Sequence, residues 1–250
     1  MSFLLITPLA PESLPYLNAL AESVEDEVRA LSEKRDIMGW RWRIQVDSDD
    51  YGLADVVENQ TPALTHLPAT VSVTGRKMGA GIARTTAWAD AGDRFSTIVT
   101  IDADDVFLPG GLAALIAPFA HSDITWVAGG NTRFDGHSGE TLGTYAPGEG
   151  LAGRVLPGAV RAAWRREQVF PFAAATAAYR STALWEVGGW PGTPTGQDAA
   201  LLLAVSDRHA GWAVREPVFG YRRHPEQATL TPEHQRLRVI TNTIMSRRVT

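Results

Sequence analysis

Residues 95–105 read Phe-Ser-Thr-Ile-Val-Thr-Ile-Asp-Ala-Asp-Asp, so an apolar, β-branched run leads directly into three carboxylates. β-Branched residues favour strands, and in an open parallel sheet ligands bind in the crevice at the carboxyl ends of the strands. Carboxylates this close repel one another unless solvent or a cation screens them, and hard divalent cations prefer oxygen ligands. The stretch predicts a strand over 95–101, followed either by a metal site at Asp102 to Asp105 or by a turn that caps the next helix.

The rest of the chain alternates between the periods of helices and strands. Apolar residues from Leu14 to Leu31 recur at helical spacing, whereas those from Trp40 to Val46 alternate with polar residues, as in a strand. Strands and helices that take turns along the chain predict an α/β fold. The expected strands are 3–6, 40–46, 71–73, 95–101 and 124–128, with extended chain at 214 and 218–221, and the expected helices are 14–31, 79–91, 112–119, 182–187, 198–208 and the segment from 232 onward.

Two further segments stand out from this alternation. The second strand also ends in acids, Asp47-Ser48-Asp49-Asp50, which predicts a second binding position at the same edge of the sheet or an acidic turn. Residues 129–158 are rich in glycine, threonine and proline and hold no period. They predict a loop-rich excursion of the kind that forms lids over binding sites.

Composition excludes several classes of protein. A chain of 250 residues with this alternation fits one domain. The net charge of −5 gives no general attraction for nucleic acid, and the lack of cysteine excludes disulfides, thiolate metal sites and a cysteine nucleophile. The apolar start lacks a basic leader, and no stretch approaches the roughly 18 apolar residues of a transmembrane helix. We therefore expect one cytoplasmic domain over 1–250, with no transmembrane segment and no nucleic-acid partner.

The order of these motifs resembles the family 2 glycosyltransferases, whose nucleotide-sugar-binding fold is called GT-A, from residue 3 to about residue 229. The stretch Phe3-Leu4-Leu5-Ile6-Thr7-Pro8 looks like the family's first strand, and Ile44-Gln45-Val46-Asp47 looks like the strand whose last aspartate contacts the nucleobase or ribose. Gly79 with Ala83-Arg84 resembles the start of the helix that leads into the metal-binding strand, and residues 101–105 match the family's aspartate-any-aspartate signature. The resemblance implies a mixed, mostly parallel central sheet flanked by helices.

The same resemblance implies an inverting glycosyltransferase that moves a sugar from a UDP-, GDP- or dTDP-linked donor to a hydroxyl of a small molecule or glycan. Asp104 is then the direct ligand of Mn²⁺ or Mg²⁺, which stabilises the charge on the leaving diphosphate. Asp102 contacts the ribose or the metal's water shell, and His224 completes the coordination or holds a phosphate. The implied nucleotide-sugar contacts are Thr7, Pro8, Asp47, Asp49, Arg76, Lys77, Gly79, Arg84, Asp102 and Ala103.

The second half of the chain resembles the family's acceptor side. Gly196-Gln197-Asp198 stands where the family carries a glutamate-aspartate pair, and Tyr221-Arg222-Arg223-His224 follows its tyrosine-arginine-any-histidine ending. Asp198 takes the position of the base that accepts the proton of the acceptor hydroxyl, although Gln197 replaces the usual glutamate. The implied acceptor or phosphate contacts are Trp190, Gln197, Arg222 and Arg223. We expect a nucleotide-binding half at 1–105, an acceptor-binding half at 106–230, a C-terminal helix at 231–250 and a possible homodimer.

Two alternatives stay open. A protein that binds nucleotide sugars without turning them over would tolerate Gln197 in place of the acid. A phosphatase of the haloacid dehalogenase type also uses aspartate-any-aspartate after a strand, but its motif normally stands near the N-terminus, and no lysine follows Lys77 here. A nicotinamide dehydrogenase is disfavoured, because Thr7-Pro8-Leu9-Ala10-Pro11 stands where its glycine-rich turn would be.

Overall fold

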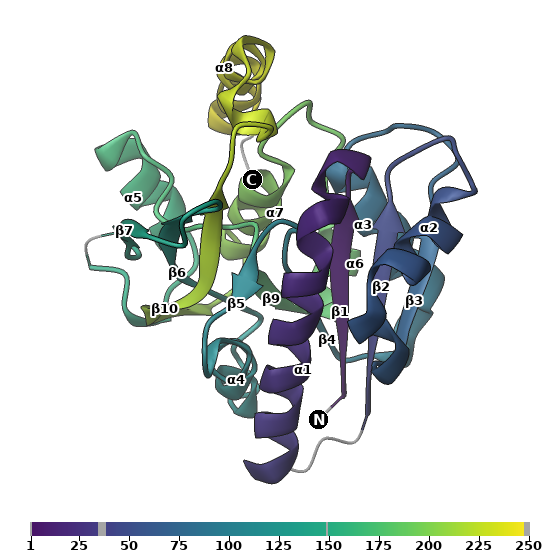
Figure 1. The fold of residues 1–250 in the computed structure, drawn as a ribbon. Helices are drawn as coiled ribbons and strands as arrows, with labels where there is room; N and C mark the ends of the chain where they lie inside the picture. The colour runs from purple at the N-terminus through teal and green to yellow at the C-terminus, as the bar shows by residue number, and fades with distance from the viewer. Residues whose placement is uncertain (1, 35–38, 149, 248–250) are drawn as a thin grey trace.

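The computed structural model describes residues 2–34, 39–148 and 150–247 (Figure 1). Within these residues the strands are β1 (Ser2–Leu9), β2 (Gly39–Val46), β3 (Ala69–Val73), β4 (Thr97–Thr100), β5 (Val106–Phe107), β6 (Trp126–Asp135), β7 (Thr141–Tyr145), β8 (Gly153–Val155), β9 (Ala177–Arg180) and β10 (Gly211–Arg223). The helices are α1 (Leu17–Lys34), α2 (Leu53–Gln60), α3 (Ala80–Ala91), α4 (Gly111–Ile116), α5 (Ala159–Glu167), α6 (Ser181–Val187), α7 (Gln197–Ser206) and α8 (Pro232–Arg247). Five 3₁₀ turns join them: η1 (Pro11–Tyr16), η2 (Pro62–His66), η3 (Gly92–Arg94), η4 (Ala117–Ala120) and η5 (Ala228–Leu230).

The strands form one mixed, mostly parallel sheet in the order β3-β2-β1-β4-β9-β6-β10-β5, with β7 beside β6 and β8 beside β10. The first four strands of this order are parallel, as are β6 and β10, whereas β9 runs antiparallel between β4 and β6. β5 follows β4 closely in sequence but pairs with β10, where Phe107 lies opposite Phe219. Residues 101–105 therefore cross from β4, in the middle of the sheet, to β5 at the edge beside β10. The predicted sheet with flanking helices is confirmed.

The core lies on both faces of this sheet, because successive side chains of a strand point to opposite faces. In β1, Phe3 and Leu5 belong to the cluster under α1 and α4, whereas Leu4 and Ile6 belong to the cluster under α3, α6 and α7. Figure 1 shows α1 in front of the sheet and α3, α6 and α7 behind it. A strand that is buried on both faces has no polar face, which is why residues 3–6 read as a continuous apolar run.

The prediction of a loop-rich excursion over 129–158 is wrong. β6 continues to Asp135, and β7 and β8 lie within the same stretch. Two of the glycines that suggested a loop, Gly129 and Gly130, lie in β6 at close contacts, and a Cβ on Gly130 would lie 2.1 Å from the backbone oxygen of Tyr145. Pairing of β6 with β9, β10 and β7 outweighs the weak local preference of this segment for a strand.

Several other elements depart from the sequence prediction. The extended pieces at 214 and 218–221 are one strand, β10, whose pattern is interrupted by register shifts around Pro217. The short elements α2, α5 and β9 have no counterpart among the predicted ones. The predicted C-terminal helix over 231–250 corresponds to α8, and residues 248–250 lie outside the described part of the chain. None of the helices within the described residues combines the length and apolar character needed to cross a bilayer.

Candidate functional site

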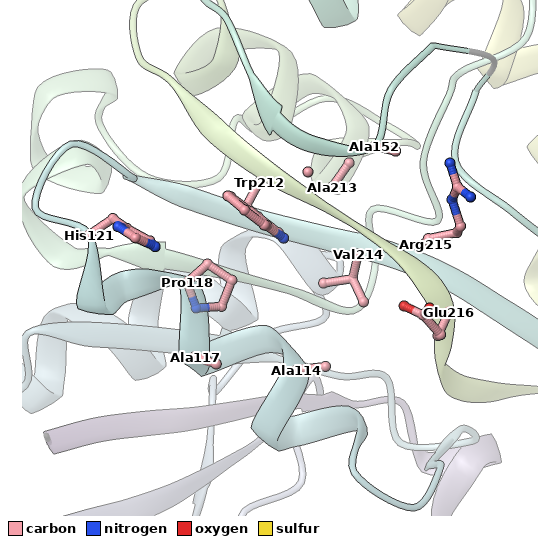
Figure 2. Close-up of a pocket in the computed structure, with 11 residues that line it drawn as sticks. Ala114, Ala117, Pro118, His121, Ala152, Trp212, Ala213, Val214, Arg215 and Glu216 are labelled. Carbon is pink, nitrogen blue, oxygen red and sulfur yellow. The ribbon is translucent and has the colours of Figure 1, made fainter.

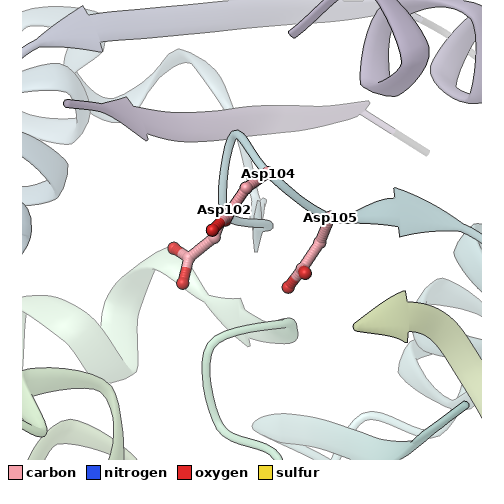
Figure 3. Close-up of side chains that lie close together, drawn as sticks. All are labelled: Asp102, Asp104 and Asp105. Carbon is pink, nitrogen blue, oxygen red and sulfur yellow. The ribbon is translucent and has the colours of Figure 1, made fainter. Parts of the chain in front are cut away.

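The turn after β4 gathers three carboxyl groups. One ligand atom from each of Asp102, Asp104 and Asp105 lies within 4.8 Å of the others. Figure 3 shows the three side chains projecting from one side of this turn. The turn follows the carboxyl end of β4, beside the parallel strand β1, which is the edge where open parallel sheets bind ligands. The sequence prediction that these acids act together is consistent with this arrangement.

Asp102 forms an ion pair with Arg84 of α3, the helix that precedes β4. Arg84 is nearly fully buried, so its charge is withdrawn from water and directed at the acid cluster. Burial raises the pKa of Asp102 to about 6; Arg84 opposes the rise, and Asp104 and Asp198 add to it. Arg84 therefore offsets only part of the rise that burial and the neighbouring acids cause in the pKa of Asp102.

Asp105 is fully buried at the base of the same turn. Its Oδ1 accepts the backbone N–H of Arg222 at 3.1 Å, while its Oδ2 has no hydrogen-bond partner among the described residues. Burial raises the pKa of Asp105, and the neighbouring Asp104 and Asp102 raise it further. An unpaired buried carboxyl oxygen beside two other acids is what a bound cation would satisfy, so the donor set fits a hard divalent metal.

His224, just beyond the end of β10, brings a ring nitrogen next to Asp104. Its Nε2 lies 3.0 Å from Oδ2 of Asp104, and its Nδ1 lies 3.2 Å from Oε2 of Glu226. Two ligand atoms at right angles on one octahedral cation, each about 2.1 Å from it, are about 3 Å apart. The spacing of Asp104 and His224 therefore fits a shared cation. Arg222 holds the backbone of the same turn, because its Nε donates a hydrogen bond to the carbonyl of Asp104 at 2.8 Å.

The second acidic run has a different arrangement. Both carboxyl oxygens of Asp47 accept backbone N–H groups, from Met78 at 2.6 Å and from Gly79 at 2.8 Å. Asp47 therefore holds the loop that opens α3, at the edge of the sheet next to the acid cluster. Asp49 is exposed, and Asp50 accepts the N–H of Gly52, as in an acidic turn. The nucleotide contacts of Asp47, Asp49 and Gly79 stay predictions.

The side chains of the remaining predicted nucleotide contacts differ in their exposure to solvent. The hydroxyl of Thr7 accepts the indole N–H of Trp42 at 3.0 Å, and Thr7, Pro8 and Ala103 are buried. Arg76 and Lys77 are exposed on the loop before α3, where Lys77 pairs with Glu12 at 3.3 Å. All lie in the loops or strand ends around the same edge of the sheet, and their contacts with a ligand stay predictions.

The predicted acceptor side lies around the start of α7. Asp198 stands in its first turn, partly buried, and its charge contributes to the raised pKa of Asp102. Gln197 packs on α3, because a Cβ on Gly81 would lie 2.7 Å from its Cγ. Trp190 is 3% exposed and meets Tyr179 edge to face at 6.2 Å, so it belongs to the core behind Asp198. The acceptor contacts of Gln197 and Trp190 stay predictions.

Three residues of this site, Tyr16, Phe134 and Glu226, have no counterpart in the sequence prediction. The guanidinium carbon of Arg222 lies 5.1 Å from the ring centroid of Tyr16 and 4.8 Å from that of Phe134. The Tyr16 ring also lies 4.5 Å from the His224 ring, and Glu226 contacts both Tyr16 and His224. No local pattern marks Tyr16, Phe134 or Glu226, since their roles come from contacts across the sheet. The predicted contact residue Arg223 lies against Tyr221, with its guanidinium carbon 5.9 Å from that ring.

A large hollow lies elsewhere on the molecule. Figure 2 shows Trp212 at its centre, with His121 and Pro118 on one side and Arg215 and Glu216 on the other. Its volume is about 660 Å³. Trp212 stands ten residues before Arg222 on β10, which corresponds to roughly 30 Å of extended strand. The hollow is thus remote from the acid cluster, and the chemistry of the cluster, not the volume of the hollow, identifies the functional site.

Comparison with known proteins gives one family match. The profile of Glycosyl transferase family 2 matches residues 44–188, which is more than half of the chain. Residues 44–188 include the acidic turn and the end of β2. No curated protein sequence matches the chain significantly.

Solved structures are similar in fold. S. aureus TarS 1–349 in complex with UDP-GlcNAc is 15% identical, with a TM-score of 0.67 over 100% of this chain and 68% of that chain. The mannosyltransferase PcManGT from Pyrobaculum calidifontis, in complex with GDP-Man and Mn²⁺, is 14% identical, with a TM-score of 0.60 over 90% and 58%. GalNAc-T7 with UDP, GalNAc and Mn²⁺ is 14% identical, with a TM-score of 0.65 over 90% and 44%.

Identities this low show the fold alone, and the predicted GT-A fold is confirmed. The chain spans 60% of TarS 1–349 in another of its structures and 58% of the mannosyltransferase.

Proposed function

The chain belongs to glycosyl transferase family 2, and on that premise we propose that it transfers a sugar from a nucleoside diphosphate donor to an acceptor hydroxyl. The observation that carries this proposal is the clustering of Asp102, Asp104 and Asp105 in the turn after β4, with His224 in contact with Asp104. The transfer is a direct displacement at the anomeric carbon, so the product has the inverted configuration.

Asp104 and His224 hold a divalent cation, Mn²⁺ or Mg²⁺, with Asp102 beside it. When bound, the cation stabilises the negative charge that develops on the leaving nucleoside diphosphate. The Oδ2 of buried Asp105 supports a cation here, since this oxygen has no hydrogen-bond partner among the described residues. The solved complexes of PcManGT and GalNAc-T7 contain Mn²⁺, which favours that ion as the first to test.

Asp198 is the base that accepts the proton of the attacking hydroxyl. A carboxylate at the start of a helix is held rigidly, and its electrostatic effect on Asp102 puts it within range of the acid cluster. Gln197 fills the neighbouring position against α3 and leaves Asp198 as the acid of this pair. The chemistry therefore does not require the glutamate that the family usually carries.

The donor lies along the edge formed by the ends of β1, β2 and β4, within the half at 1–105, and the acceptor enters the half at 106–230. Arg222 and Arg223 supply positive charge near the diphosphate. TarS and PcManGT bind UDP-GlcNAc and GDP-Man respectively, so UDP- and GDP-linked sugars are the first donors to test, with dTDP-linked sugars third. The acceptor in this proposal is a small molecule or a glycan. The protein acts as a homodimer in the cytoplasm.

A second candidate function is nucleotide-sugar binding without transfer, and Gln197 is the residue that favours it. It differs from the first in turnover: an active enzyme hydrolyses its donor slowly even without acceptor, whereas a binding protein leaves it intact. A phosphatase of the haloacid dehalogenase type is excluded, because the acidic turn follows the fourth strand of a glycosyl transferase family 2 domain.

The experiment is calorimetric titration of UDP, GDP and dTDP, each with and without Mn²⁺, into the wild type and Asp104→Ala. Asp55→Ala is the matched control, because Asp55 is an exposed aspartate on α2 outside the site. We expect one nucleotide to bind in a metal-dependent way to the wild type and the control, and not to Asp104→Ala. Equal binding by Asp104→Ala, or no binding by the wild type, would refute the assignment.

A further inference from the structure

His224 presents each of its ring nitrogens to a carboxylate. Nε2 faces Oδ2 of Asp104 at 3.0 Å, and Nδ1 faces Oε2 of Glu226 at 3.2 Å. A neutral imidazole has one N–H, so it can donate to only one of these two acceptors. The other nitrogen then directs its lone pair at a carboxylate, an arrangement that a cation between the two groups would stabilise. Which nitrogen keeps the proton decides whether His224 can act as a metal ligand toward Asp104.

The chain that follows His224 is shaped so that Glu226 returns to the ring. Nε2 of Gln227 donates to the carbonyl of Arg222 at 2.6 Å, which closes the turn over residues 222–227. The buried Gln227 thereby fixes a turn in which the side chain of the preceding residue, Glu226, is 59% exposed. An exposed side chain pays rotamer entropy to hold one position, so its contact with a buried ring needs further support.

Tyr16 gives that support from the other end of the sequence. Its hydroxyl donates to Oε2 of Glu226 at 3.5 Å, the same oxygen that contacts His224. Its ring lies 4.5 Å from the His224 ring, centroid to centroid, and covers it. The His224 side chain is consequently only 5% exposed, although it stands in a turn near the surface. Tyr16 and Glu226 together surround the nitrogen of His224 that faces away from the acid cluster.

We propose that Glu226 and Tyr16 are positioning residues of the metal site: Glu226 accepts the Nδ1–H of His224, and Tyr16 holds Glu226 and the ring, so that the Nε2 lone pair faces Asp104 and the cation between them. This inference rests on the proposed function, since it assumes a cation at Asp104. A carboxylate that accepts the second N–H of a metal-bound histidine fixes its tautomer and its orientation and raises its basicity as a ligand.

The expected loss of metal affinity follows from the effect of similar carboxylate partners in other metal sites. Removal of an outer carboxylate partner typically lowers metal affinity by about 10- to 100-fold. Glu226→Ala removes the acceptor, so we expect a loss of about tenfold or more. Glu226→Gln keeps a neutral acceptor oxygen and restores part of the affinity. Tyr16→Phe keeps the ring and removes only a long hydrogen bond, so its loss is smaller than that of Glu226→Ala.

The test is Mn²⁺ binding followed by the electron paramagnetic resonance signal of free Mn²⁺, with Mn²⁺ alone and again with UDP or GDP present. Glu216→Ala is the control for Glu226→Ala, since Glu216 is an exposed glutamate on β10 remote from the site. Nitrogen-15 spectra of the histidine rings, recorded with diamagnetic Mg²⁺, report the tautomer of His224 directly. We expect the proton on Nδ1 in the wild type and a mixture of tautomers in Glu226→Ala, a change that loss of stability alone does not produce.

The outcomes separate the two proposals. If the wild type binds Mn²⁺, Asp104→Ala does not, and Glu226→Ala binds as the wild type does, the proposed function stands and the inference is overturned. If the wild type itself binds no Mn²⁺ under any of these conditions, both fall together. The graded loss, greatest in Glu226→Ala, less in Glu226→Gln and absent in Glu216→Ala, supports the inference.

Discussion

Replacing Asp47 should destabilise the loop that opens α3. Its carboxylate accepts two backbone N–H groups, from Met78 and Gly79, while only 7% exposed. A hydrogen bond to a charged group contributes about 1.5–3 kcal/mol to stability. Met78 is exposed, so its freed N–H can bond to water, whereas the N–H of Gly79 is less accessible. We therefore expect Asp47→Ala to lower the free energy of unfolding by about 3 kcal/mol, toward the lower end of the sum for two such bonds.

Asp47→Asn keeps one acceptor oxygen and turns an amide N–H toward the second backbone donor, so we expect a loss of at least about 1.5 kcal/mol. Urea denaturation of the wild type and both variants measures these differences, with Asp49→Ala as the control because Asp49 is exposed in the same run. A loss below about 1 kcal/mol for Asp47→Ala would refute the structural role. In that case, weaker nucleotide binding by an equally stable variant would identify Asp47 as a nucleobase contact.

Three further predictions follow from other parts of the chain. Arg161→Ala should lower the free energy of unfolding by about 3 kcal/mol, measured by thermal denaturation, because it leaves buried Asp207 without its partner; an unchanged melting temperature would contradict this. Gly130→Ala should destabilise by more than about 2 kcal/mol in urea, since its Cβ would overlap the Tyr145 carbonyl, while Gly192→Ala, with an ordinary contact at 3.8 Å, should not; equal stability of the two variants would contradict the close approach. Chelation of divalent metal with EDTA should abolish nucleotide binding, measured by calorimetry, and added Mn²⁺ should restore it; binding that persists in EDTA would argue against a metal-dependent site.

Local sequence predicted the parts of the fold in which burial follows the period of one helix or strand. Residues 3–6 are buried on both faces of the sheet and therefore read as an apolar run, and α1 shows a helical period because one of its faces packs on the sheet. The stretch 129–158 was not predictable in this way. Its glycines at 129 and 130 lie against neighbouring chain, and pairing with strands distant in sequence keeps β6 extended.

In the candidate site, too, the features carried by neighbouring residues were predictable and the contacts between distant residues were not. The acidic turn at Asp102 to Asp105 was evident from sequence because a strand and its following turn are contiguous, and three carboxylates in four residues need screening whatever surrounds them. The identity of the partners that share this charge was not evident. Arg84 reaches Asp102 from a helix, and Asp105 is held by the backbone of Arg222, more than a hundred residues later.

Sequence by itself thus determined the α/β alternation, the carboxylates at the strand ends and, through their order, the resemblance to a family, because each of these is carried by neighbouring residues. Only the tertiary structure decided that Asp47 binds the backbone of the loop that opens α3, that Trp190 lies in the core, and that Tyr16 and Glu226 enclose the ring of His224. The physical reason is distance along the chain: a contact between Tyr16 and Glu226 crosses 210 residues, and no local preference specifies it until the strands of the sheet have brought the two ends together.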